Sequence, residues 1–88
     1  MWVKIGDNHV INLNLMGEFW CDFESLCIVI GEIPFDSGVK RILLLYFEDD
    51  GKMMKAYETL IDGLKLNKNY VDISGHVVNV EEAVYEGE

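Results

Sequence analysis

The sequence predicts an α+β fold in which an antiparallel β-meander of four to six strands packs on one α-helix at about residues 50–64. Short segments before residue 25 alternate apolar and polar residues, which is the period of a β-strand. Residues 26–30 and 41–48 are two further strands, and both are apolar on both faces. From Met53 to Leu64 the apolar residues recur at steps of three and four, the period of an amphipathic helix. A change of period within a short chain is typical of the α+β class.

The strand segments are separated by residues that favour turns. Gly6 to His9 forms a turn cluster, and Pro34, Asp36 and Gly38 mark a loop in which the proline cannot donate to a sheet ladder. The strands expected before the helix are residues 2–5, 10–15, 19–24, 26–30 and 41–48.

The helix has recognisable ends. Asp49 or Asp50 can cap its N-terminus, and the charges of Lys65 and Lys68 suit its C-terminal end. Strands are expected at residues 70–73 and 76–80. The acidic segment that follows is expected to fray, so residues 1–80 form a single domain and residues 81–88 a tail.

Charge and composition narrow the classes of partner. The chain has 88 residues and a net charge of −9, so direct binding to a phosphate backbone is disfavoured and basic partners are allowed. The charge is also explained by solubility alone. No secretory signal is expected, and the longest apolar run, residues 42–47, is far shorter than the ~20 residues that span a membrane. We therefore expect a cytoplasmic protein that does not bind a membrane.

Apolar residues on both faces of the middle strands raise the question of what covers the second face. One helix, about 10–12 Å across, covers only part of one face of a five-stranded sheet. The second face could be covered by the C-terminal strands folding over, by a second copy of the chain or by another protein. A large exposed apolar face favours an interface with a second copy or another protein. The candidate interface residues are Trp2, Trp20, Leu43, Leu45 and Phe47.

The chemistry-bearing residues do not form a recognisable enzyme or cofactor motif. Cys21, Cys27, His9 and His76 have the number but not the paired spacing of a zinc site. If the chain reverses near residues 23–25, the two cysteines lie opposite each other in a hairpin, where a disulfide is geometrically possible and a reducing compartment keeps it open. We expect two reduced, buried thiols, and no metal, cofactor or catalytic residue.

Three segments suggest a wider resemblance. In "MWVKI", "HVINL" and "KAYETLIDGL" the chain resembles a broad group of small bacterial and phage proteins. These begin with a Trp-containing strand, continue through an "INL" strand and a meander, and close with one helix. The resemblance covers about residues 1–66 and implies a fold order but no activity.

The function expected from the sequence is therefore that of a small non-catalytic protein-interaction module. It oligomerises or binds a protein partner through an apolar sheet face. The alternative is an acidic inhibitor, encoded by a phage or mobile element, that blocks a basic nucleic-acid-binding site on a host protein.

Overall fold

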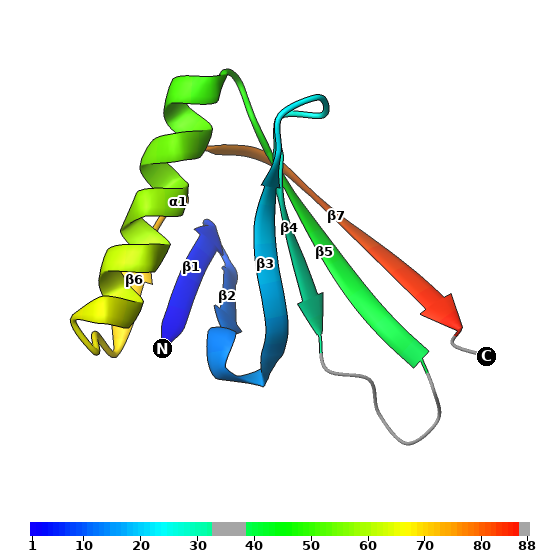
Figure 1. The fold of residues 1–88 in the computed structure, drawn as a ribbon, viewed down its shortest axis with the longest axis horizontal. Helices are drawn as coiled ribbons and strands as arrows, with labels where there is room; N and C mark the ends of the chain where they lie inside the picture. The colour runs from blue at the N-terminus through cyan, green and yellow to red at the C-terminus, as the bar shows by residue number, and fades with distance from the viewer. Residues whose placement is uncertain (33–38, 87–88) are drawn as a thin grey trace.

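A computed structural model describes residues 1–32 and 39–86, with side chains described over residues 1–31 and 42–83. The loop expected at residues 34–38 lies outside the described residues. Figure 1 shows the elements in chain order: β1 (Trp2–Gly6), β2 (His9–Asn12), the 3₁₀ helix η1 (Leu13–Leu15), β3 (Met16–Asp22), β4 (Cys27–Glu32), β5 (Val39–Phe47), α1 (Asp50–Lys65), β6 (Tyr70–Asp72) and β7 (Val77–Glu86).

The described strands are divided between two sheets. One has the order β2-β1-β6 and the other the order β3-β4-β5-β7. Every pair in the four-stranded sheet is antiparallel, whereas β1 is antiparallel to β2 and parallel to β6. The predicted α+β class, with one helix packed against an antiparallel sheet, is confirmed. The second sheet was not indicated by the sequence pattern.

A single 3₁₀ turn separates the two sheets. The side chain of Asn12 accepts a hydrogen bond from the backbone N–H of Asn14 at 3.1 Å, and the N–H of Met16 donates to the carbonyl of Leu13. Asparagine offers the backbone this local alternative to a sheet ladder. The strand expected at residues 10–15 therefore ends at Asn12, and the chain leaves the first sheet to begin the second.

The parallel pair joins the beginning of the described chain to the segment after the helix. Trp2 is in register with Tyr70, and Val3 with Val71. Backbone hydrogen bonds extend the junction at both ends, from Trp2 N–H to the Asn69 carbonyl at 2.8 Å and from Ile73 N–H to the Lys4 carbonyl at 3.0 Å. The helix is thus the crossover between β5 and a strand of the other sheet.

The helix begins and ends as its sequence predicts. The Asp49 carboxylate caps the N-terminus by accepting the N–H of Lys52 at 2.8 Å. At the C-terminus Lys68 N–H donates to the Gly63 carbonyl, and Asn67 N–H to the Leu64 carbonyl. This is a Schellman motif, and Asn67 occupies its left-handed position with φ 53°. The observed bounds differ from the predicted ones by one residue.

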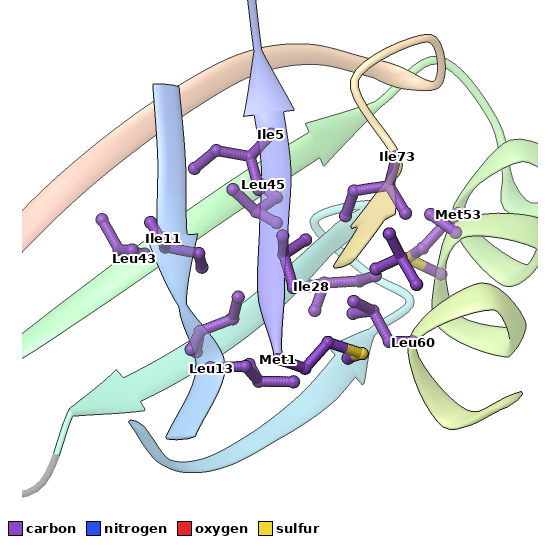
Figure 2. Packing of buried hydrophobic residues seen from close by; sticks show 14 of the residues in the cluster. Met1, Ile5, Ile11, Leu13, Ile28, Leu43, Leu45, Met53, Leu60 and Ile73 are labelled. Carbon is purple, nitrogen blue, oxygen red and sulfur yellow. The ribbon is translucent and has the colours of Figure 1, made fainter. Parts of the chain in front are cut away.

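The hydrophobic core lies between the two sheets and against the helix. Figure 2 shows side chains of β1 and β2 packed over those of β4 and β5, with Met53 and Leu60 of α1 closing one side. The largest fully buried side chains are Val3, Ile5, Ile28, Ile30, Leu45, Met53, Leu60 and Ile73. Burial of such side chains contributes about 1.5–3 kcal/mol each to the free energy of folding, so these residues dominate the stability of the domain.

The tail expected to fray is a strand. β7 runs to Glu86 and pairs with β5 from Val39↔Glu86 to Phe47↔Val77. The prediction of a frayed segment from residue 81 is therefore wrong over residues 81–86, and residues 87–88 lie outside the described ones. Backbone pairing with the long strand β5 orders this segment despite its acidic composition, because ladder hydrogen bonds are independent of side-chain charge.

Candidate interaction surface

The structure separates the five residues that the sequence suggested for an interface. Trp2 on β1 and Trp20 on β3 are exposed, with 52% and 42% of their surfaces accessible. The three residues from β5 are buried in the core: Leu43, Leu45 and Phe47.

Because these three residues of β5 are buried, the prediction that their side chains form an interface is wrong. The face of β5 that carries Leu43, Leu45 and Phe47 packs inside the fold, where the three-stranded sheet and α1 cover it. The sequence predicted one helix as cover and left open that the C-terminal strands fold over the sheet, but it did not predict that β1 and β2 form a second sheet with β6. The opposite face of the four-stranded sheet is therefore the one to consider, and Trp20 belongs to it.

We call this opposite face the outer face. Strand register and alternation place on it three described residues from each of four strands. They are Glu18, Trp20 and Asp22 of β3, Cys27, Val29 and Gly31 of β4, Ile42, Leu44 and Tyr46 of β5, and Asn79, Glu81 and Ala83 of β7.

The centre of the outer face is an apolar strip. Trp20 is in register with Val29, and Val29 with Leu44. Val29 is only 7% exposed, yet it does not belong to the core cluster, so its neighbours on the same face cover it. Ile42 and Leu44 are half-buried and likewise lie outside the core cluster. The apolar residues of this face therefore form a patch of their own.

Polar groups at one end of the face are held in place by hydrogen bonds. The Tyr46 hydroxyl donates to the Glu81 carboxylate at 3.2 Å, across the β5–β7 pair. Desolvation raises the pKa of Tyr46, and the hydrogen bond and charge of Glu81 raise it further. The Asp22 carboxylate accepts the backbone N–H groups of Glu24 and Ser25, which orders the β3–β4 turn and fixes this charge at the edge of the sheet.

The two cysteines do not face each other. The β3–β4 hairpin is confirmed, but Cys21 is in register with Ile28, and Cys27 with Asp22. The expected direct opposition is therefore wrong by one residue. Cys21 packs toward the core while Cys27 belongs to the outer face, because neighbouring register positions alternate between the faces of a sheet.

Both thiols are free and weakly acidic. Burial raises the pKa of Cys21. Burial also raises the pKa of Cys27, and the negative charge of Asp22 adds to this effect, followed by those of Cys21 and Glu81. A raised pKa leaves little thiolate at neutral pH, and the thiolate is the reactive form. The Cys27 thiol is consequently a packing group within the outer face.

Charge is distributed unequally between the two layers. Among the described side chains, the basic ones lie on β1, on α1 or just after α1: Lys4, Lys52, Lys55, Lys65 and Lys68. The described side chains of the four-stranded sheet include acids and no base: Glu18, Asp22, Glu81 and Glu82. Three of these acids belong to the outer face, so its apolar centre is flanked by negative charge.

A separate cleft of about 430 Å³ runs between β3 and α1. Its walls are mostly apolar, from Met16 and Phe19 on one side to Tyr57 and Ile61 on the other. Phe19 and Tyr57 meet edge to face, with ring centroids 5.7 Å apart. The cleft shares only Glu18 with the outer face, and its apolar walls belong to other residues.

The described residues contain neither a metal-binding cluster nor a membrane-spanning helix. Within the described residues, no three His, Cys, Asp or Glu side chains gather closely enough to hold a metal ion. In the same part of the chain, no helix combines the length and apolar character needed to cross a bilayer.

Comparison of the chain with protein-family models, with curated proteins and with solved structures found no match. The resemblance to small bacterial and phage proteins therefore stays an expectation from the sequence, and the argument for function rests on the outer face.

Proposed function

We propose that this chain is a small, non-catalytic protein-interaction module that binds a protein through the outer face of its four-stranded sheet. The observation that supports the proposal is the apolar strip of Trp20, Val29 and Leu44 on a face that no described layer of the fold covers. Sheets with one face toward water normally carry polar residues there, and contiguous exposed apolar patches mark interaction sites.

The composition of the strip fits this role. Tryptophan and tyrosine are enriched among the residues that dominate binding energy at interfaces, and the outer face carries Trp20 and Tyr46. Trp20 is exposed although neighbouring positions on its face are apolar, so a partner would remove water from a large side chain. The hydrogen bonds that hold Tyr46 and Asp22 reduce the loss of side-chain freedom on binding.

The acidic inhibitor suggested by the sequence is not favoured by a specific observation. Such an inhibitor would gather its acids on one face. Here acids also lie on α1 and on the turns of the other layer, as Asp7, Glu58 and Asp62 show.

Site-specific photo-crosslinking tests the proposed function. A photoreactive residue at position 20 should crosslink to one discrete protein species in cells that produce the chain natively. The same residue at position 58, exposed on α1, is the matched control and should give no such species. Leu44→Thr keeps a strand-favouring residue while removing apolar contact, so it should abolish the crosslink from position 20. Crosslinks that are equal at both positions, or unaffected by Leu44→Thr, contradict the proposal.

A further inference from the structure

We infer that the outer face receives a basic amphipathic helix of another protein, and not a second copy of this chain. The inference rests on the proposed function and names the chemistry of the partner. It is carried by two properties of the outer face: where its charges lie and how far apart they are.

The charges lie on the two edge strands, and the apolar residues of the outer face other than Trp20 and Ala83 lie on the two strands between them. Asp22 is on β3 and Glu81 is on β7, which are the outermost strands of the sheet. Cys27, Val29, Leu44 and Tyr46 occupy the two strands between. A segment with an apolar stripe and a basic group on each side would match this arrangement.

The spacing suits one helix. Three strand spacings separate β3 from β7, or about 14 Å at ~4.8 Å each. A helix with its side chains is about 10–12 Å across. A helix lying along the strands would therefore place its apolar stripe on Leu44 and the exposed Trp20, with Val29 buried beneath them, and long basic side chains on its flanks would reach Asp22 and Glu81. Arginine would also stack on the exposed Trp20 ring.

A second copy fits this face poorly. In a two-fold interface the same patch meets itself, so the acids of the two copies would share one interface. Each copy also carries a net charge of −9, and juxtaposed like charges disfavour association. Strand spacing and residue rise give the part of the outer face with described side chains a flat area of about 400 Å². A contact on this area buries about 800 Å² in total with either kind of partner, which is the size of a weak or transient interface, so the charges and not the area distinguish a helix from a second copy.

Binding of synthetic helical peptides tests the inference. Three peptides share one leucine stripe and carry arginine, glutamine or glutamate on their flanks. Trp2→Phe leaves Trp20 as the one tryptophan of the chain, so its fluorescence reports contact with the outer face. The arginine peptide should bind most tightly, the glutamate peptide most weakly, and the preference should fall as salt is added.

Two matched double variants test whether the acids of the outer face, and not the net charge of the protein, attract the arginine peptide. Asp22→Asn with Glu81→Gln removes two charges from the outer face while keeping the acceptor oxygens that hold the β3–β4 turn and Tyr46. Glu58→Gln with Asp62→Asn removes the same charge from α1. The first pair should weaken binding of the arginine peptide by about fivefold or more, and the second by less than about twofold. Equal effects from the two pairs would overturn the inference, because attraction to net charge alone would then explain the binding.

The remaining outcomes separate the inference from the proposed function. If the glutamine peptide binds as well as the arginine peptide and Leu44→Thr weakens both, the inference fails and the proposed function stands. If sedimentation shows a dimer that Leu44→Thr dissociates, a second copy is the occupant and the inference again fails. If no peptide changes Trp20 fluorescence and position 20 gives no crosslink, both fail.

Discussion

Gly63 of α1 and Val71 of β6 approach so closely that a β-carbon at position 63 would lie 3.0 Å from Val71 Cγ1. The same β-carbon would lie 2.7 Å from the sulfur of Met1. Glycine in a helix costs about 1 kcal/mol relative to alanine. At this position the cost is offset because the missing side chain lets α1 pack directly on the three-stranded sheet.

Gly63→Ala should therefore destabilise the protein although alanine favours a helix. Overpacking typically costs about 1–3 kcal/mol, which exceeds or matches the gain of about 1 kcal/mol in helix propensity. Chemical denaturation measures the free energy of unfolding. Adding Val71→Ala should relieve part of the crowding, so Gly63→Ala should cost less in that background. An increase in stability from Gly63→Ala alone would show that the helix can move away freely.

Asn67→Gly should raise the free energy of unfolding by about 0.5–1 kcal/mol. Asn67 has φ 53°, in the left-handed region that glycine adopts without a steric penalty, and it closes the Schellman motif of α1. Asn67→Ala, measured by the same thermal unfolding, should lower stability, since alanine tolerates this conformation less well than asparagine. Identical stabilities for the two variants would argue against the left-handed cap.

Leu60→Ala should destabilise the protein by about 2–5 kcal/mol, because Leu60 is fully buried in the core and its truncation leaves a cavity. Leu66→Ala is the matched control. Leu66 follows α1 and is 68% exposed, so its truncation should change stability by about 0.5 kcal/mol or less. Urea unfolding measures the free energy of unfolding of both variants. Comparable losses of stability in the two variants would mean that α1 is not packed as described.

Cys21 and Cys27 should react slowly with iodoacetamide at pH 8 in the folded protein and quickly in denaturant. Their raised pKa values reduce the thiolate fraction, and Cys27 is also buried. Mild oxidation should give no intrachain disulfide, since the two side chains belong to opposite faces of the sheet. Mass spectrometry measures both the alkylation and the disulfide. The variants Cys21→Ala and Cys27→Ala show which cysteine gives each signal. Rapid bridge formation would instead support the direct opposition expected from the sequence.

Stability should fall as the pH rises above about 9. The ordinary pKa values are 9.0 for the cysteines and 10.0 for Tyr46, and folding raises all three. A group whose pKa is raised in the folded state contributes stability that is complete below the unfolded value and is lost as pH passes through the folded value. Denaturation at pH 8 and pH 10.5 measures the loss. Glu81→Gln should reduce it, because the Glu81 charge raises the pKa of both Tyr46 and Cys27.

Local signals in the sequence predicted the helix and the hairpin well. Asp49 is an N-cap next to a strong apolar stripe, and such an element is determined within a few turns of chain. The predicted register of the β3–β4 hairpin was wrong by one residue, because the length of the turn depends on the hydrogen bonds and backbone conformations of particular residues. Asp22 accepts two backbone N–H groups and Leu26 adopts φ 53°, which makes a four-residue turn at residues 23–26.

The candidate surface was only partly predictable. Trp20, a candidate interface residue from the sequence, is exposed in the structure. The choice between the two faces of β5 could not be predicted, because Leu43 and Leu45 are as apolar as Ile42 and Leu44. The three-stranded sheet alone decides which face of β5 is buried. That sheet depends on the parallel pairing of β1 with β6. The sequence of neither strand carries a local signal for this pairing.

The pairing of Trp2 with Tyr70 has a consequence for the order in which the protein folds. About 65 residues, including the whole of α1, separate β1 from its parallel partner β6. The β3–β4 hairpin and α1 involve short loops and can form early, whereas closing the β1–β6 loop carries a larger entropic cost. Refolding should therefore be limited by the docking of β6 on β1, on the slow millisecond-to-second scale of folds with distant contacts.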